Sequence, residues 1–397
     1  MTALAAFEGR GPGTDTERRA ARWLAGELVA DRRRVRIETF WCRPNWALAH
    51  AWHVALALVG SLISVGDPVV GTVVLAVALV STVTDELLGG VSIGRRLSPE
   101  RASQNVVASA RRTTGPARAS RLILTTNYDA GRTGLIDRDV FRAATTRLNR
   151  ITGGRGPGWL GWLVVAITSE LAIAVLRLTE SHPPASLGAV QLPPAVALVI
   201  GLALLLATAG AGYGPAAGDN ATGVAAAVAL ARALAADPPG NLSVELVLQG
   251  AGESEGLGLR NYLRVHKREL RDKYPVVLGI AASGAGRPAW WVSDGPLVPL
   301  RYAKTLRALA AQTEATPHRG RGATPALPAR AAGLPAIAIG CLDSRELAPR
   351  SHQQADTADR VDASALDGAI ALGLALVNKI DSSLEPETQQ TGAATPA

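Results

Sequence analysis

Side chains that can bind a metal follow several of the predicted strands and open one of the predicted helices. They fall at four places in the chain: Asn127 with Asp129, Asp219 with Asn220, Glu253 with Glu255, and His352. In an open α/β sheet, ligands bind beyond the carboxyl ends of the strands, so we expect these groups to meet at one edge. Carboxylate oxygens and imidazole nitrogens are donors that zinc accepts. The pattern therefore indicates a zinc site at that edge.

Each of these residues, taken singly, also has a purely structural interpretation. Asp219 precedes a helix, where an aspartate commonly caps the first turn. Glu253 would then be a solvated residue at the end of a strand, and His352 an ordinary loop residue. Only their convergence in space would separate a metal site from this alternative.

Strands and helices alternate along the segments that carry these residues. Strands are predicted at residues 35–41, 121–129, 242–250, 274–283 and 334–340, and helices at residues 14–30, 218–236, 255–270 and 362–380. The strands are apolar, β-branched or alternating runs, whereas the helices show apolar residues at helical spacing. Such alternation predicts an α/β fold with a mostly parallel central sheet flanked by helices.

Four apolar stretches interrupt this pattern, at about residues 47–65, 68–88, 158–176 and 193–212. Each approaches the ~20 residues that a helix needs to cross the hydrocarbon core of a membrane. Glu170 lies in the third stretch, and His50 and His53 lie in the first, so these two are less apolar than the others. The stretches form two close pairs, which favours transmembrane helical hairpins over long buried helices of a soluble protein.

A hairpin returns the chain to the side of the membrane that it left, so a sheet domain can still close around it. We therefore predict one discontinuous α/β domain, two insertions and a tail. The domain comprises residues 1–46, 89–157 and 213–381, the transmembrane hairpins residues 47–88 and 158–212, and the disordered tail residues 382–397. The second hairpin includes a short external loop, and the composition of the tail is typical of disorder.

The net charge of +8 comes mostly from arginines that flank the apolar stretches. They gather before the first stretch and between the second and third, whereas the connections within the pairs carry almost none. The positive-inside rule then places the N-terminus, the central segment and the C-terminal segment in the cytoplasm. A multi-pass protein of the cell membrane, with its soluble domain on the cytoplasmic side, is the expectation.

Nucleic acid is not an expected partner, because the arginines do not interleave with aromatic residues, which make up 4% of the chain. Cys42 and Cys341 lie far apart without the spacing of a disulfide framework or a cysteine zinc site. The N-terminal segment lacks the apolar core of a secretory signal. The expected partners are the lipid bilayer and a membrane protein or peptide.

Six segments of the chain, in order, resemble the peptidase family M28. They include residues 103–129 (SQNVVAS and then RLILTTNYD), 216–234 (AAGDNATGVAAAVALARAL), 244–263 (VELVLQGAGESEGLGLRNYL), 327–340 (LPARAAGLPAIAIG) and 351–362 (SHQQADTADRVD), besides the opening segment 14–40. These are similar to the family's His-x-Asp, Asp-Asn-x-Ser-Gly, Glu-Glu, Gly-x-Pro and His-x-x-x-Asp-Thr motifs. The resemblance implies a two-zinc aminopeptidase fold.

In that family two zinc ions share a bridging aspartate, which the resemblance places at Asp219. The first metal also uses a histidine and a later acidic residue, and these positions hold Asn127 and Ala281 here. A carboxamide is a poor zinc ligand and a methyl group is none, so this metal site is expected to be empty. The aspartate that orients the missing histidine is retained as Asp129.

The second metal of the family uses the bridging Asp219 together with positions that fall on Glu253 and His352. These three residues are expected to hold one zinc ion at most. The general-base glutamate falls on Gly252, and loss of a positioned base costs on the order of 10²–10⁴ in rate. Glu255 is the candidate substitute base, because it lies close to this position in the sequence.

The resemblance therefore implies a degenerate, membrane-inserted member of the family. The leading hypothesis is a pseudo-peptidase that acts as a binding or scaffolding module. The alternative is an active metallo-aminopeptidase or other hydrolase that uses a single residual zinc ion. A transporter or channel is disfavoured, since Glu170, His50 and His53 are the polar residues that stand out in the four apolar stretches.

Overall fold

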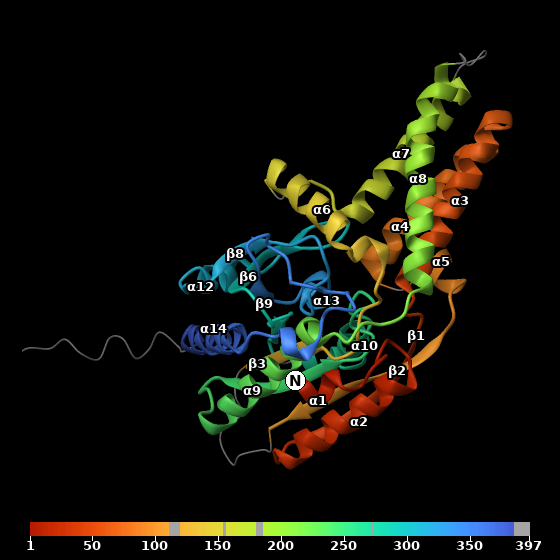
Figure 1. Cartoon of the computed structure of the whole chain (residues 1–397). Coiled ribbons are helices and arrows are strands. Elements are labelled where there is room, and N and C mark those ends of the chain that lie inside the picture. The colour runs from red at the N-terminus through yellow and green to blue at the C-terminus, as the bar shows by residue number, and fades with distance from the viewer. Residues whose placement is uncertain (90, 111–119, 154–155, 180–185, 272, 385–397) are drawn as a thin grey trace, which may run out of the picture.

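A computed structural model describes residues 1–89, 91–110, 120–153, 156–179, 186–271 and 273–384. The described part comprises an α/β domain and a bundle of long helices that projects from one edge of it (Figure 1). The last helix of the domain ends at Ser382, so most of the predicted tail, residues 385–397, lies outside the described residues.

One mixed sheet forms the centre of the domain. Its strands are β1 (Arg34–Cys42), β2 (Arg101–Ser109), β3 (Ser120–Asn127), β4 (Leu242–Gln249), β5 (Val276–Ile280), β6 (Arg287–Asp294), β7 (Leu300–Arg301), β8 (Thr316–Arg319) and β9 (Ala336–Leu342). Their spatial order is β1-β2-β4-β3-β5-β9-β6-β7, with β8 paired to β6. The strands predicted from the sequence are β1, β3, β4, β5 and β9.

The prediction of a mostly parallel sheet holds for the centre, where β4, β3, β5 and β9 run parallel. The flanks differ, because β1 with β2, β2 with β4, and β6 with β9 are antiparallel. No helix lies between β5 and β6, so the chain reverses there without a crossover. Between β1 and β2, the inserted helices return the chain to the end of the sheet that it left.

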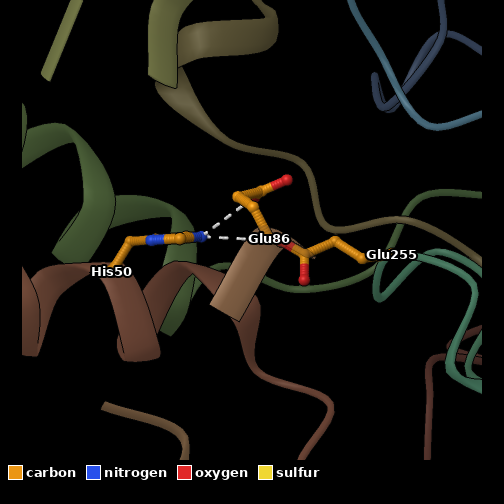
Figure 2. Close-up of side chains that lie close together, drawn as sticks. All are labelled: His50, Glu86 and Glu255. Atoms are coloured by element: carbon orange, nitrogen blue, oxygen red, sulfur yellow. Dashed lines mark ion pairs between the residues drawn. The ribbon is translucent and has the colours of Figure 1, made fainter. Parts of the chain in front are cut away.

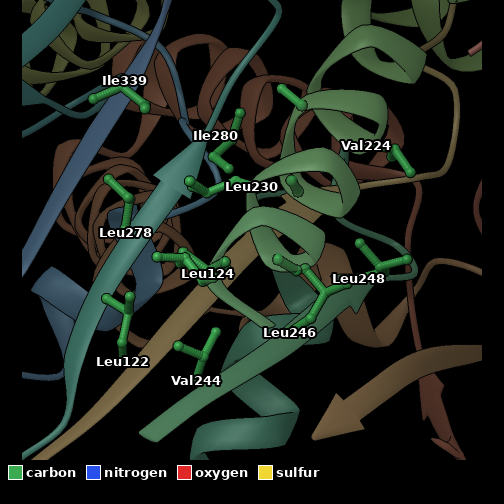
Figure 3. Packing of buried hydrophobic residues seen from close by; sticks show 14 of the residues in the cluster. Leu122, Leu124, Val224, Leu230, Val244, Leu246, Leu248, Leu278, Ile280 and Ile339 are labelled. Carbon is green, nitrogen blue, oxygen red and sulfur yellow. The ribbon is translucent and has the colours of Figure 1, made fainter. Parts of the chain in front are cut away.

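Alternate side chains of the central strands enter two separate cores. Leu122 and Leu124 of β3 pack beneath α2 (Asp15–Ala30), α9 (Thr222–Ala236) and α14 (Ala363–Ser382). Figure 3 shows this face, with Leu246 and Leu248 of β4 beside them. Ile123, between the two leucines, instead faces α10 (Leu257–Val265) and α13 (Leu327–Ala331). The sheet is therefore covered on both faces, which accounts for the burial of its central strands β3 and β4.

Five helices among the described residues are long and apolar enough to cross a membrane. They are α3 (Trp46–Gly66), α4 (Pro68–Leu88), α7 (Trp159–Thr179), α8 (Ser186–Gly210) and α14. Helix α14 packs on the sheet through Leu372, Leu376 and Val377, so its apolar face is already covered by the domain. The other four pack against one another and extend away from the sheet (Figure 1), an arrangement compatible with membrane insertion.

The remaining helices are short or lie in connections. They are α1 (Thr2–Ala5), α5 (Ile93–Arg96), η1 (Leu135–Asp137), α6 (Asp139–Ile151), η2 (Ala217–Ala221), α11 (Lys267–Arg271), α12 (Lys304–Ala310) and η3 (Ala358–Arg360). Helix α5 follows α4 and leads into β2, and η2 leads from α8 into α9. Both therefore lie where the long helices join the sheet.

A group of buried polar residues lies in the interior of the four-helix bundle. Glu170 accepts a hydrogen bond from the Ser61 hydroxyl at 2.8 Å, and Arg177 donates to the side-chain oxygen of Gln191 at 2.6 Å. Gln191 in turn donates to the Ser61 hydroxyl at 2.6 Å. Because these groups bind one another, they can lie inside a bundle that presents apolar residues outward.

Candidate functional site

The three predicted metal ligands come together at the edge where the parallel strands end. Asp219 lies in the turn before α9, Glu253 follows β4, and His352 lies in the loop after β9. The Nε2 atom of His352 is 3.0 Å from Oε2 of Glu253 and 3.9 Å from Oδ2 of Asp219. We call these three residues the edge triad. Their use as metal ligands stays a prediction, but the convergence that distinguishes it from unrelated structural roles is present.

Two buried aspartates fix the loops that carry the edge triad. Asp129 accepts hydrogen bonds from the backbone N–H groups of Gly252 and Glu253 at 2.9 and 3.0 Å. Asp356 accepts from the backbone N–H groups of Gly218 and Asp219, both at 2.9 Å. Each carboxylate therefore binds two successive amides and sets the path of the loop. Asp129 therefore supports the loop after β4. The position of the histidine that the resemblance would have it orient is held by Asn127.

Asn127 and Asn220 occupy one oxygen of Glu253. Their side-chain amides donate to Glu253 Oε1 at 2.9 and 2.8 Å. The other carboxylate oxygen, Oε2, faces His352 at hydrogen-bond distance. Glu253 is therefore bonded on both oxygens by protein groups alone.

Gly252 is the position that the resemblance assigns to the general base, and Asn127 packs against it. A Cβ atom added to Gly252 would lie 2.3 Å from Oδ1 and 2.7 Å from Cβ of Asn127. Contacts of this length are not tolerated in a packed protein without movement of a neighbour. With Asn127 in this place, no side chain fits at residue 252.

The charges of the edge triad are mutually supporting. Burial lowers the pKa of His352, but its contacts with Glu253, Asp137 and Asp219 outweigh this and raise it to about 10. Burial raises the pKa of Glu253, but His352 and Asn127 outweigh this and lower it below its usual range. The arrangement is thus an imidazolium paired with the carboxylate of Glu253, while burial and the Glu253 charge raise the pKa of Asp219 to about 6.

A cavity of about 410 Å³ opens over the edge triad. The triad and Ala281 form one wall, and Ala281 offers no metal-binding atom at the end of β5. Trp46 and Trp159, at the starts of α3 and α7, form another wall, with their ring centroids 5.7 Å apart. The cavity therefore lies between the α/β domain and the helical bundle.

Glu255 also lines this cavity, but its carboxylate is bound to Arg95 of α5 through Oε2. Burial raises the pKa of Glu255, while Arg95 and His50 outweigh this effect and lower it to about 2. A carboxylate that holds its proton so weakly is a poor general base at neutral pH. The structure thus ties the candidate substitute base to the helical bundle.

Glu255 belongs to a second group of polar side chains, which the sequence did not indicate. His50 of α3, Glu86 of α4 and Glu255 place one donor atom each within 4.8 Å of one another. Figure 2 shows the imidazole of His50 pointing toward the two carboxylates. In the sequence, His50 stands out as a polar residue in an apolar stretch. No sequence spacing links it to residue 255.

Residues 206–377 match the model of peptidase family M28. Among solved structures, an aminopeptidase from Aneurinibacillus sp. strain AM-1 is 12% identical and has a TM-score of 0.54, with 95% of this chain and 92% of that chain covered. A glutaminyl cyclase from Bacteroides thetaiotaomicron is 11% identical, with a TM-score of 0.50 and coverage of 95% and 94%. At these identities, the likeness shows the fold alone.

A zinc aminopeptidase from Bacillus subtilis also matches, at 14% identity and a TM-score of 0.43, and this chain spans 54% of its length. The match covers 72% of the present chain. No curated protein shows significant sequence similarity to the chain.

The family context suggests zinc, but the residues present do not fit a two-zinc centre. Asn127 and Ala281 occupy the positions that the resemblance assigns to a histidine and an acidic ligand, and Asn127 donates to Glu253. The edge triad retains donors of the types needed for a single zinc ion. Those donors already make direct hydrogen bonds, so a metal there would have to displace the contact between His352 and Glu253.

Proposed function

We propose that this chain is a membrane-embedded M28 peptidase-like protein that has lost peptidase activity and binds a peptide end in the cavity between its α/β domain and its helical bundle. The observation that carries the proposal is the position of Asn127. Its amide binds Glu253, and its side chain fills the space over Gly252 where a general base would stand.

The chemistry of the cavity supports a peptide-like ligand, which carries groups of both charges. Asp219 and Asp294 line it together with Arg319 and Arg321, and the two tryptophans of α3 and α7 supply apolar area. A free N-terminal ammonium group can donate to such carboxylates, while an adjoining apolar side chain packs on the indole rings. The volume of about 410 Å³ suits a ligand the size of a short peptide end.

A second candidate function is favoured by the edge triad itself. One aspartate, one glutamate and one histidine can hold a zinc ion with a water in the fourth position. The chain would then be a hydrolase with a single metal. Without a positioned base, its rate would fall by about 10²–10⁴ relative to a complete site.

An activity assay separates the two candidates. We expect the full-length chain in detergent to show no aminopeptidase or glutaminyl cyclase turnover above that of an Asp219→Asn variant, with or without added zinc. We also expect it to bind peptides with a free N-terminus at least about tenfold more tightly than their N-acetylated forms, because acetylation removes the charge. Chelator-sensitive turnover that disappears in Asp219→Asn would overturn the proposal in favour of the hydrolase.

The proposal includes two membrane-spanning helix pairs, α3 with α4 and α7 with α8, and a domain on the cytoplasmic side. The flanking arginines support this orientation through the positive-inside rule. In sealed inside-out vesicles, we expect protease to remove a tag fused after Ala397, and in right-side-out vesicles we expect the tag to be protected. Cleavage of the tag only in right-side-out vesicles would show the opposite orientation.

A further inference from the structure

A second cluster of metal-binding side chains lies at the junction of the bundle and the domain. It comprises His50 near the start of α3, Glu86 near the end of α4, and Glu255 in the loop after β4, and we call it the junction cluster. It shares no residue with the edge triad. The three side chains come from three separate elements and point toward a common point (Figure 2).

The donor atoms of the junction cluster are buried, and several of them make no hydrogen bond. His50 is 1% exposed, and neither of its ring nitrogens has a hydrogen-bond partner among the described residues. Oε1 of Glu86 likewise has none. Buried polar atoms without hydrogen bonds are costly and rare. His50 and Glu86 meet only as an ion pair 3.5 Å long, which leaves room for a ligand between them.

The distances within the cluster fit a shared ion better than direct hydrogen bonds. Nε2 of His50 is 3.5 Å from Oε1 of Glu86 and 3.5 Å from Oε1 of Glu255. Hydrogen bonds to charged carboxylates are shorter, at about 2.7–2.9 Å. Zinc bound at about 2.0–2.2 Å in a tetrahedron holds its ligand atoms about 3.3–3.6 Å apart. The separations from His50 match that tetrahedral edge.

The edge triad provides an internal comparison. There, His352 and Glu253 are a histidine and a glutamate in direct contact, at 3.0 Å, with the geometry of a hydrogen bond. Nε2 of His50 lies within 4 Å of three carboxylates, those of Asp85, Glu86 and Glu255, and comes closer than 3.5 Å to none of them. A protonated imidazole that merely neutralised these carboxylates would be expected to approach one of them as His352 does.

Neighbouring charges hold the carboxylate of Glu255 in place. Arg95 binds Oε2 of Glu255, which leaves Oε1 facing His50. Asp85 binds the Nε atom of Arg95 through both of its oxygens, at 3.1 and 3.0 Å, and so fixes the arginine. Groups that orient metal ligands in this way are a regular part of metal sites. Glu86 and Glu255 also line the cavity, from which a water or ligand atom can complete the coordination.

We propose that His50, Glu86 and Glu255 bind a divalent cation, with zinc favoured by one imidazole and two carboxylates in tetrahedral spacing. The ion would link α3 and α4 to the loop that carries Glu253. It would thereby join the helical bundle to the cavity.

Metal content measured in a background without the edge triad tests this proposal. The background is the full-length chain in detergent with Asp219→Asn and His352→Gln, stripped with chelator and reloaded with zinc. We expect it to retain about one zinc per chain, bound by three protein ligands. Adding His50→Gln or Glu86→Gln should remove that equivalent. Adding His266→Gln should not, because His266 pairs with Glu38 away from the cluster.

Cobalt(II) gives a readout that does not depend on the folding of a variant. In the background protein, cobalt should give the strong visible absorption of a tetrahedral site, and zinc should displace it. Absence of both zinc and the tetrahedral cobalt spectrum from folded background protein would overturn the proposal. So would full zinc retention in the His50→Gln and Glu86→Gln variants.

Discussion

Replacing Arg95 by alanine should lower the free energy of unfolding by about 3–5 kcal/mol, the cost of breaking a buried ion pair from one side. Arg95 is fully buried and pairs with both Asp85 and Glu255. It also donates to the backbone carbonyl of Arg43 at 2.8 Å, at the end of β1. Its loss would leave two buried carboxylates without their guanidinium and loosen the junction between bundle and sheet.

The adjacent Arg96 is the matched control for this experiment, because it is exposed on the same short helix. Arg96→Ala should change stability by less than about 0.5 kcal/mol. Thermal unfolding in detergent, followed by tryptophan fluorescence, measures both variants against the unmodified chain. Equal melting temperatures for the two variants would show that the buried ion pair does not hold the junction.

Replacing Asp129 by alanine should lower the free energy of unfolding by about 2–6 kcal/mol, because each of two orphaned buried donors costs about 1–3 kcal/mol. Two donors are involved, the backbone N–H groups of Gly252 and Glu253. Asp129 has no exposed surface, so water cannot replace its carboxylate in the unrelaxed structure. The loop after β4 should then open more readily and expose its amides.

Hydrogen exchange of residues 250–256 measures this opening directly, alongside the change in unfolding temperature. Asp129→Asn is the graded control, since its single carbonyl oxygen can satisfy one of the two amides. Asp139→Ala serves as the neutral control, because Asp139 is exposed at the start of α6. Unchanged exchange in Asp129→Ala would show that the loop keeps its path without this carboxylate.

The sequence predicted the central fold well, because local patterns encode it. The apolar run before Asn127 forms β3, with every residue buried, and the run from residue 242 forms β4. The antiparallel flanks were not predictable from alternation alone. Strand β6, with Trp290 and Trp291, has no flanking helix to mark it as part of an α/β repeat. Helix α14 shows a second limit, since an apolar helix can cover a sheet as well as cross a membrane.

The candidate site was predictable only where family motifs mark it. Asp219, Glu253 and His352 were found by their order in the chain, and they do meet. The hydrogen bonds from Asn127 and Asn220 to Glu253 require three-dimensional positions that no spacing reveals. The junction cluster was missed for the same reason, since Glu255 lies more than two hundred residues from His50. The sequence therefore indicated Glu255 as a base and could not show that Arg95 holds it.

The place of the long helices between the strands sets the order in which this protein can be assembled during translation. Strand β2 pairs with β4 through Val106 and Leu248, and β3 pairs with β4 along its whole length. All four bundle helices leave the ribosome before β4 does. The nascent chain must therefore hold β2 and β3 with open edges while the bundle forms, and such edges invite pairing with other chains. Early anchoring of the bundle would keep them apart from other nascent chains until β4 arrives.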